Sequence, residues 1–568
     1  MKIKDLGIIG DRRTCALLTK EGEFVWYCPG RFDKAAWFSS LVDPEKGGSW
    51  SYKYNGKKFT GRSYNKRSAL LETNYKNLTV EDFMPLSKKS NGICRIFSEA
   101  PEAIENDVFL KPAFGLGLPE YDVDREKNQV TISRSLFLSA SHPITVEENH
   151  LKFTIPKGET GWAFLSEQPF KEKISEELIF SLKKETLEGW KEIASKIKYE
   201  GIYEKEVNDS LRAIQLMTFQ ENGGIIAAGT TSLPEIPGGK RNYDYRYVWL
   251  RDCAMIVSAL IRAESNGEEE RKFMSFLCDA KHRNSQKILL PFYSLDKLVA
   301  QPEENLPLAG YQNSRPVRTG NNAMDQLQLD ANANVLIVAK MIYGKTEKKE
   351  HWETVVAIAD FLVERWKEKD HGIWEEEAKE HFTSSKVIVS KALEFIADFA
   401  ETDEQKASWL NASKEIRKFV MENCLTKSGA FGIYPGSEKV DVTAALFPIW
   451  LFIEPDAPEM KKTIELLEKN HREGELYHRT LENFDASKEG VFLAGCFWMA
   501  QNYIMMENFE KAEKIIEAAL KFSNDLGYFA EEGDIKSGEM LGNFPQTFVH
   551  ASFIGAVIDL NKKHNKQQ

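Results

Sequence analysis

The chain has 568 residues and a formal net charge of -11, with 28% charged and 42% hydrophobic residues. This length exceeds what one ordinary core holds, so we expect two or more domains. The acidic balance argues against binding to nucleic acid or anionic lipid, because both require a basic surface. No window approaches the ~18 consecutive apolar residues of a membrane span, and the first residues contain no continuous apolar segment of the signal-peptide kind. We therefore predict a cytoplasmic protein with a neutral small-molecule substrate, no nucleic-acid partner and no membrane partner.

The cysteines and histidines show no spacing that indicates a metal or redox site. Seven cysteines are scattered along the chain, and no two of them form a C-x-x-C pair. Ten histidines include no H-x-H and no H-E-x-x-H spacing. We therefore predict reduced thiols and no metal ligands. The sequence says nothing about oligomeric state.

The first 173 residues are typical of β-structure. Short alternating runs such as 130–138 and 151–155 are separated by turn clusters such as Glu21-Gly22 and Asn55-Gly56. The many short strands favour an antiparallel β-sandwich over a barrel. A charged helical stretch follows, so we assign residues 1–173 to the β-sandwich domain and 174–200 to a helical linker.

From about residue 201 to the end the hydrophobic period is helical. Some expected helices have one apolar stripe, whereas others, such as the one near 489–507, are apolar on most faces and must be buried all round. Pairs of one surface helix and one buried helix close naturally into two concentric rings, an (α/α)6 barrel over residues 201–568. The twelve expected helices lie near 203–222, 251–264, 268–282, 322–343, 348–367, 383–400, 404–423, 440–453, 458–471, 489–507, 508–525 and 545–561.

In such a barrel the loops that enter the inner helices share one face. These loops contain nearly all of the motifs that combine acidic, basic and aromatic side chains: 249–252 (WLRD), 315–321 (RPVRTGN), 374–376 (WEE), 477–479 (YHR) and 530–532 (AEE). Acidic and aromatic residues that are merely exposed to solvent would be spread over both ends of the barrel. Their convergence therefore predicts a functional site on this face.

The loop 371–377 (HGIWEEE) places three carboxylates directly after a tryptophan. A carboxyl against an indole face loses water on one side, which disfavours its charged form, as a general acid requires. A second carboxylate must then come from elsewhere in the chain. The alternative interpretation is a solvated acidic run, which is the more common explanation of such triplets.

The segment 241–252 (RNYDYRYVWLRD) combines aromatic, arginine and aspartate side chains. An Arg-Asp pair here can be a plain structural salt bridge. The same set also suits a sugar, because Asp accepts from vicinal hydroxyls, Arg donates to oxygens and an aromatic ring covers the apolar face of the pyranose.

With these motifs in place, the sequence resembles glycoside hydrolase family fifteen, which contains glucoamylases, glucodextranases and microbial trehalases. The resemblance covers both expected domains. It is carried by 8–14 (IIGDRRT), 29–33 (PGRFD), 229–235 (GTTSLPE), 242–252 (NYDYRYVWLRD), 314–321 (SRPVRTGN), 372–375 (GIWE) and 542–546 (GNFPQ). The joint order and spacing of these segments make a chance match very improbable.

The resemblance implies a β-sandwich before an (α/α)6 barrel and inverting exo-hydrolysis of an α-glucoside, without metal or organic cofactor. By matching motifs, Glu375 resembles the general acid and Glu531 the general base. The latter is expected to stay ionised, so that it can take a proton from water. The residues expected to bind substrate are Tyr245, Trp249, Arg251, Asp252, Arg315, Arg318, Trp374, Glu376 and Arg479.

Three positions depart from the family pattern. Tyr243 stands where many relatives have tryptophan. The segment 477–479 matches only loosely, so a sugar contact by His478 or by Arg479 is open. Glu532 follows Glu531 directly, and the choice of Glu531 as the base therefore rests on the resemblance.

Several functions compete. We expect a glucan 1,4-α-glucosidase that releases β-glucose from non-reducing ends, with a trehalase on the same scaffold as the alternative. An inverting α-glucoside phosphorylase would need an anion pocket and no carboxylate base, so Glu531 argues against it. A glycan-binding protein without catalysis is disfavoured because both carboxylates, Arg251 and Asp252 are all present. The sequence does not show which glycosidic linkage or which substrate chain length the protein prefers.

Overall fold

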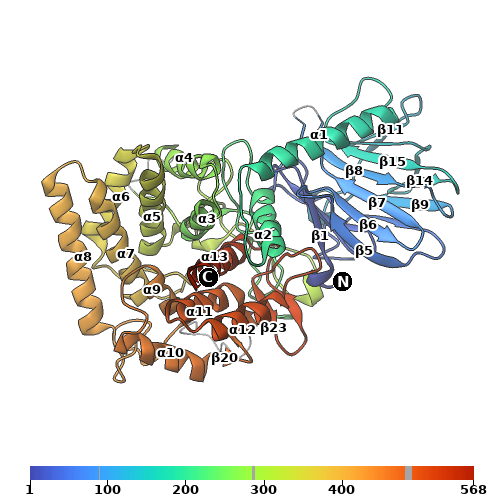
Figure 1. The fold of residues 1–568 in the computed structure, drawn as a ribbon. Coiled ribbons are helices and arrows are strands. Elements are labelled where there is room, and N and C mark those ends of the chain that lie inside the picture. Colours follow the sequence, from blue (N-terminus) through green and yellow to red (C-terminus); the bar gives the residue numbers. More distant parts are fainter. Residues whose placement is uncertain (88–89, 284–287, 480–488, 568) are drawn as a thin grey trace.

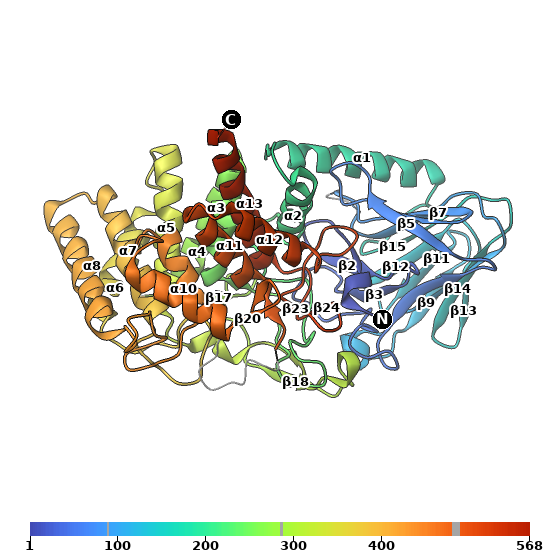
Figure 2. The same ribbon diagram turned by 60° about the horizontal axis from the view of Figure 1, so that its bottom comes forward.

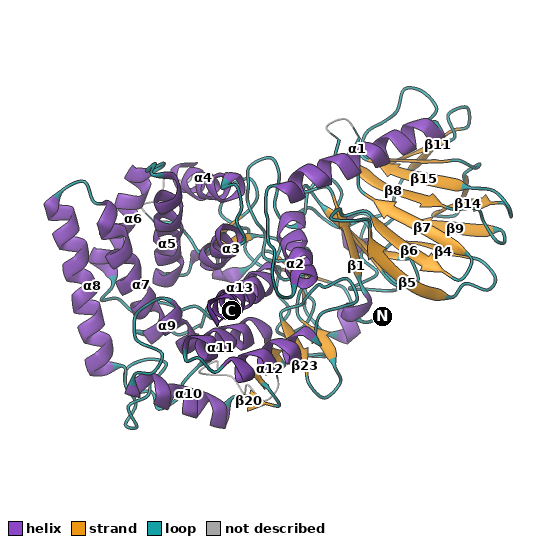
Figure 3. Ribbon diagram, in the orientation of Figure 1, coloured by secondary structure: helices purple, strands orange, loops and turns teal. Residues whose placement is uncertain are grey.

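The computed structural model describes residues 1–87, 90–283, 288–479 and 489–567. Strands dominate the N-terminal part and helices the rest, and the two kinds of structure are segregated in space (Figure 1, Figure 3). The predicted order of a β-sandwich followed by a helical barrel is confirmed.

Two antiparallel sheets form the sandwich in the part of the chain that the structure describes. Their alternating burial, as in β6, reflects the period of two in the sequence. The seven-stranded sheet has the order β1 (Gly7–Gly10), β2 (Cys15–Leu18), β3 (Phe24–Tyr27), β4 (Ser49–Lys53), β9 (Ile104–Phe109), β14 (His150–Ile155) and β13 (Thr145–Glu147). The eight-stranded sheet has the order β10 (Tyr121–Asp124), β11 (Gln129–Ile132), β12 (Leu136–Ala140), β15 (Gly161–Ser166), β8 (Gly92–Phe97), β7 (Leu78–Phe83), β6 (Leu71–Tyr75) and β5 (Phe59–Tyr64).

Helix α1 (Glu176–Ser195) connects the two regions. Ser175 caps it, since its hydroxyl accepts from the Leu178 amide at 3.3 Å. Ile179 and Leu182 bury one face of α1 against Phe83 and Trp162 of the eight-stranded sheet. The helix therefore packs on the sandwich as it runs toward the barrel (Figure 1). The domain boundaries at 173 and 200 remain our proposal.

The described residues of the helical region form twelve α-helices in two rings. The inner helices are α3 (Leu250–Arg262), α5 (Leu329–Thr346), α7 (Thr383–Ile396), α9 (Leu446–Ile449), α11 (Leu493–Met505) and α13 (Thr547–Gln567). The outer helices are α2 (Glu204–Leu216), α4 (Glu268–Arg283), α6 (Trp352–Arg365), α8 (Asp403–Asn423), α10 (Pro458–Asn470) and α12 (Phe509–Leu520). Each inner helix contacts the next, and α13 contacts α3, so the inner ring is closed.

Burial separates the two rings as the hydrophobic pattern predicts. Every residue of α11 from Leu493 to Ile504 is buried. In contrast, α8 buries only one stripe, which includes Trp409, Ala412 and Ile416. The inner helices therefore form the barrel core, and the outer helices cover it.

Several helices differ from their expected bounds, including α12, which ends at Leu520, and α13, which extends to Gln567. Helix α9 covers only Leu446–Ile449, after a 3-10 turn over Val442–Ala445, because Pro448 has no N–H to donate to the preceding turn. Helix α2 ends at Leu216, six residues early, where the chain enters a turn and an isolated bridge between Thr218 and Ile225. Helix α5 begins at Leu329, after a 3-10 turn over Asn322–Asp325 and an extended break.

The sandwich packs directly against loops of the barrel and against the start of helix α4. The Trp26 indole donates to the Gly229 carbonyl at 2.9 Å, and Arg12 pairs with Glu269 at 2.9 Å. Arg246, which is paired with Asp244 at 2.7 Å, also donates to the Lys34 carbonyl at 2.8 Å. The segment 242–252 is therefore anchored to the N-terminal region.

All seven cysteines are free and buried, as expected from their number and spacing. In the described part of the chain, no helix combines the length and the apolar character needed to cross a bilayer.

Candidate active site

Short strands gather at one end of the barrel, where the loops enter the inner helices (Figure 2). They are β16 (Val248–Trp249) with β17 (Phe292–Tyr293), β18 (Glu304–Leu306) with β19 (Val317–Thr319), β20 (Arg472–Glu473) with β21 (Leu476–Tyr477), and β22 (Val491–Phe492) with β23 (Glu532–Asp534) and β24 (Glu539–Leu541). A cavity of about 840 Å³ lies among these loops. Its lining includes residues just before or at the start of α3, α5, α7, α11 and α13, which agrees with the predicted convergence of the loops.

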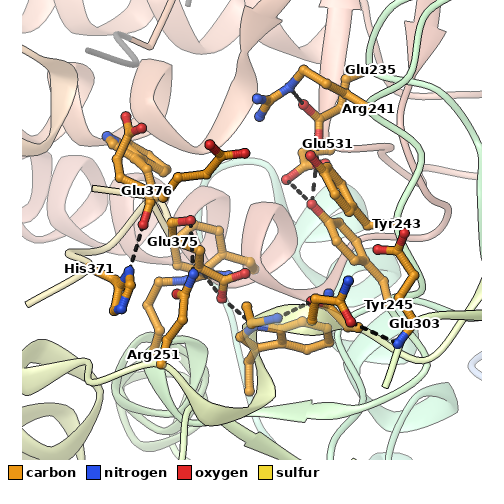
Figure 4. Close-up of a pocket in the computed structure, with 18 of the residues that line it drawn as sticks. Glu235, Arg241, Tyr243, Tyr245, Arg251, Glu303, His371, Glu375, Glu376 and Glu531 are labelled. Carbon is orange, nitrogen blue, oxygen red and sulfur yellow. Dashed lines mark hydrogen bonds and ion pairs between the residues drawn. The ribbon is translucent and has the colours of Figure 1, made fainter. Parts of the chain in front are cut away.

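The loop 371–377 is held by hydrogen bonds within the loop and by one hydrogen bond from the extended segment that precedes α5. The Glu376 amide donates to the His371 carbonyl at 3.0 Å, and the His371 ring contacts the Glu376 carbonyl at 2.7 Å. Gln326 donates to the Glu375 carbonyl at 3.2 Å. Glu375 itself has a φ of 59°, in the left-handed region that a non-glycine residue seldom adopts. These contacts turn its side chain into the pocket (Figure 4).

One oxygen of Glu375 is fixed by two donors from the start of α3. The Trp249 indole N–H lies 2.7 Å from Glu375 Oε1, and Arg251 Nη1 lies 3.3 Å from the same atom. Trp249 is in turn stacked on Phe292, with ring centroids 4.4 Å apart. Among the described residues no hydrogen bond reaches Oε2, so this oxygen is available to a ligand in the pocket.

Glu531 approaches the pocket from the loop before β23 and is only 5% exposed. Its Oε1 accepts from the Tyr245 hydroxyl at 3.1 Å, whereas its Oε2 is buried without a hydrogen-bond partner among the described residues. Gly542, with a φ of 82°, lies against it, and a Cβ there would stand 2.9 Å from Glu531 Cβ. The glycine of the segment 542–546 therefore leaves room for this carboxylate.

The structure separates Glu531 from Glu532. Glu531 lines the pocket, but Glu532 is fully buried outside its lining, and its Oε2 accepts from the Gly490 amide at 3.1 Å. Successive side chains of an extended segment point to opposite sides. This placement supports the choice of Glu531 as the base. Figure 4 shows Glu375 and Glu531 on different walls of the pocket.

The protonation of Glu531 differs from our expectation. Burial, followed by the negative charge of Glu235, raises the pKa of Glu531 to about 8. The raised pKa runs against our expectation that this carboxyl is ionised at neutral pH, because burial of a carboxyl favours its neutral form. Sequence alone does not show how deeply a loop residue is buried.

A cluster of buried charges lies behind Glu531. Arg479 Nη2 lies 2.6 Å from Glu235, Arg479 Nε lies 3.1 Å from Glu489, and Nη2 lies 3.4 Å from Glu532. Arg241 Nε contacts Glu235 at 2.7 Å and Glu489 at 2.9 Å. The three glutamates place one oxygen each within 4.8 Å of one another, as a cation site would. Two guanidinium groups already pair with these carboxylates, so the cluster is an ion-pair network as it stands.

Arg479 lines the pocket, as predicted, whereas His478 does not and contacts Glu473 at 2.9 Å. Several guanidinium N–H groups of Arg479 bond to glutamates of the charge cluster, and its guanidinium also lies 5.4 Å from the ring centroid of Trp374. We therefore expect Arg479 to act on a ligand mainly through its neighbours.

The hairpin β18–β19 forms another wall. Arg318 pairs with Glu303 at 3.0 Å and lies over the Tyr243 ring at 5.0 Å, and all three residues line the pocket. The Ser232 hydroxyl accepts from the Arg318 amide at 2.7 Å, which fixes the strand. Arg315 was also expected to bind substrate, but it is exposed, lies outside the lining and donates to the Ala309 carbonyl at 3.3 Å. Arg315 lies between the 3-10 turn over Tyr311–Asn313 and strand β19.

Asp252 differs in part from its prediction. It is buried, it is not part of the pocket lining, and its Oδ1 accepts from Arg251 Nε at 3.0 Å. Arg251 itself lines the pocket and also donates to the Ile373 carbonyl at 2.9 Å. Asp252 is thus placed to orient Arg251. The remaining predicted residues, Tyr245, Trp249, Trp374 and Glu376, line the pocket.

Some lining residues were not singled out from the sequence. Glu235 ends one of the motifs that carry the resemblance, so this motif was a signal that it belongs to the site. Glu303, Gln326, Phe492 and Phe548 carry no local motif, and only the fold brings them here.

Comparisons with known proteins agree with this architecture. The sequence model "Glycosyl hydrolases family 15" matches residues 201–508 and 499–558, and the model "Trehalase-like, N-terminal" matches residues 1–160. Trehalase 1 of Sulfolobus acidocaldarius is 30% identical over 574 residues, which cover 98% of each chain. The trehalase of Thermoplasma volcanium is 29% identical over 580 residues, covering 97% of this chain and 92% of the relative.

Among solved structures, a bacterial glucoamylase complexed with acarbose superimposes with a TM-score of 0.72. The match covers 100% of this chain and 96% of the glucoamylase, at 13% sequence identity, and it therefore supports the fold alone. With the family match spanning most of the barrel, the chain belongs to glycosyl hydrolases family 15 and is a glycoside hydrolase.

Proposed function

We propose that this protein hydrolyses α,α-trehalose to two glucose molecules, with inversion at one anomeric carbon. The observation that carries the proposal is the match over nearly the whole chain to relatives named trehalase. It reverses our order of preference, in which a glucan 1,4-α-glucosidase came first. The likeness to a glucoamylase concerns the fold, so the glucan 1,4-α-glucosidase is kept as the second candidate.

In the proposed mechanism Glu375 is the general acid. Its Oε1 is fixed by Trp249 and Arg251, and its Oε2 carries the proton toward the glycosidic oxygen. Departure of that oxygen leaves positive charge on the sugar ring. The nearby Arg251 and Trp374 hold the ring, with Asp252 orienting Arg251.

Glu531 is the proposed general base. Its free Oε2 takes a proton from the attacking water while Tyr245 holds Oε1. An inverting enzyme needs the water between base and sugar, on the face opposite the acid. Because burial raises the pKa of Glu531 to about 8, we expect hydrolysis by the free enzyme to rise with pH through the neutral range.

The volume of about 840 Å³ suits a disaccharide. We assign the second glucose to the wall formed by Tyr243, Glu303 and Arg318, where a ring face and an ion pair can meet a pyranose and its hydroxyls.

The test is incubation of the protein with trehalose, maltose, maltotriose, isomaltose and starch, each with and without phosphate. Free glucose from trehalose, independent of phosphate, is the expected result. Faster release from maltotriose or starch would instead identify a glucan glucosidase. A requirement for phosphate together with glucose phosphate as product would identify a phosphorylase, and no product from any sugar would indicate a binding protein.

A further inference from the structure

Glu235 lies behind the proposed base, at the end of the segment 229–235. It lines the pocket but is only 2% exposed. Its Oε2 accepts from Arg241 Nε at 2.7 Å and from Arg479 Nη2 at 2.6 Å. Its Oε1 lies 3.4 Å from the Tyr245 hydroxyl. One carboxylate oxygen is thus used by two arginines and the other faces Tyr245.

The Tyr245 hydroxyl lies between two carboxylates. It is 3.1 Å from Glu531 Oε1 and 3.4 Å from Glu235 Oε1. A phenol has one O–H to donate, so it can satisfy only one ionised carboxylate at a time. The second contact becomes a hydrogen bond only when one of the carboxylates carries a proton and donates it to the tyrosine oxygen. Tyr245 therefore couples the protonation of Glu531 to Glu235.

The charges around the pair fix which of the two carboxylates titrates. Burial opposes ionisation of Glu235, but Arg241 and then Arg479 outweigh it, and the pKa of Glu235 is held below its usual range. Glu531 faces Glu235, Arg479, Tyr245 and Arg251. Glu489 and Glu532 complete the network on the far side of Arg479. The two arginines therefore favour the charged form of Glu235, whereas burial and the charge of Glu235 favour the neutral form of Glu531.

We propose that Glu235 is a positioning residue that acts through Tyr245 to keep Glu531 oriented and strongly basic. A carboxylate beside a second anion binds a proton more tightly, because protonation relieves the repulsion. When Glu531 Oε2 takes the proton from water, the water oxygen bonds to the anomeric carbon, and the glycosidic C–O bond breaks as Glu375 gives its proton to the leaving oxygen. Glu531 is then neutral and its Oε1 is a weaker acceptor, so the Tyr245 hydroxyl turns to donate to Glu235. The inference rests on the proposed role of Glu531 as the base.

The experiment is the pH profile of kcat/KM for Glu235→Gln with trehalose. Removal of the negative charge makes Glu531 easier to ionise, so we expect the acidic limb to move to lower pH by about one unit. We expect kcat to fall as well, by up to about 10²-fold, because Tyr245 no longer has its second partner. The matched control is Glu489→Gln, which removes a carboxylate from the same two arginines. Glu489 is not part of the pocket lining and reaches Glu531 only through Glu235 and the arginines, so the acidic limb of Glu489→Gln should move much less than that of Glu235→Gln, even if the melting temperature falls.

The outcomes separate this inference from the proposed function. If Glu531→Gln abolishes hydrolysis while Glu235→Gln keeps the wild-type limb, Glu235 has no influence on the base and the inference is overturned alone. If Glu531→Gln hydrolyses trehalose normally, Glu531 is not the base and this inference fails with that role, whereas the proposed function itself fails if the wild type releases no glucose from trehalose.

A second variant covers the case in which Glu235→Gln does not fold. Glu235→Asp keeps the charge for the arginines but shortens the reach to Tyr245. We expect its acidic limb to remain at the wild-type pH, its KM to change little and its kcat to fall. A wild-type kcat in Glu235→Asp would overturn the positioning role.

Discussion

Tyr245 and Trp249 pack edge to face, with ring centroids 5.5 Å apart. Each of these rings donates one hydrogen bond to one of the two proposed catalytic carboxylates, the phenol to Glu531 and the indole to Glu375. The acid and the base therefore share one rigid aromatic support. A shift of either ring should disturb both carboxylates together.

The stereochemistry of the products is the first prediction. Inversion at one anomeric carbon of trehalose gives one β-glucose, and the departing sugar keeps its α-configuration. We expect equal amounts of the two anomers in NMR spectra taken before mutarotation. Formation of α-glucose alone in early turnover would contradict inversion.

The second prediction concerns Glu375. We expect Glu375→Gln to lower kcat on trehalose by about 10²–10⁴-fold, because the leaving oxygen is no longer protonated. Hydrolysis of α-glucosyl fluoride should be spared, since fluoride needs little protonation to leave. Glu377→Gln is the comparison, because Glu377 belongs to the same acidic triplet but has an exposed side chain at the pocket, so a much smaller loss is expected. Equal losses on both substrates would exclude a role as the acid.

The third prediction links Glu531 to stability. The folded chain holds this proton up to about pH 8, whereas an ordinary glutamate releases it near 4.5. Between these values the folded state binds more protons, so the carboxyl's contribution to stability is present below the lower pKa and is lost as the pH rises through the upper one. Glu531→Gln should therefore melt higher than the wild type at about pH 8.5 and close to it near pH 4. A lower melting temperature of the variant at the alkaline pH would contradict the burial argument.

Asp252→Asn is the fourth test. The change weakens the contact with Nε of Arg251, an arginine whose Nη1 also supports Glu375. Misplacement of such a group can cost about 10²-fold, so we expect kcat/KM to fall by that order. Arg315→Ala serves as the comparison, because an exposed arginine outside the pocket should change stability by no more than about 0.5 kcal/mol and leave activity intact. A fully active Asp252→Asn that melts much lower would mean that Asp252 forms only a structural ion pair.

The fifth prediction concerns Arg246, which anchors the catalytic segment to the sandwich. Arg246→Ala leaves Asp244 buried without its partner, which typically costs about 3–5 kcal/mol. It also frees the loop that carries Tyr245 and Trp249, so kcat should fall together with the melting temperature. Calorimetry and steady-state kinetics on the same preparation check this. Unchanged kcat in a destabilised variant would show that the loop is held by the barrel alone.

Sequence periodicity was sufficient to predict the sandwich, the barrel and the face that contains the site, because inner and outer helices differ in how many of their faces are apolar. It could also place Glu375 and Glu531 in loops on that face. It could not predict that Arg315 points to solvent, that Asp252 lies behind Arg251, or that Glu303 joins the pocket. These outcomes depend on tertiary packing. The raised pKa of Glu531 also depends on tertiary packing, because segments far away in the chain bury this side chain.

The closure of the inner ring by α13 against α3 also has a consequence for the order in which the protein is made. Glu375 and its supports from α3 emerge from the ribosome long before Glu531 and Phe548, which follow much later in the sequence. A nascent chain that stops before Thr547 lacks the last inner helix, and its ring stays open beside α3. A chain truncated before Thr547 should therefore lack hydrolysis although it contains both Glu375 and Glu531, because the wall that α13 adds to the ring is missing.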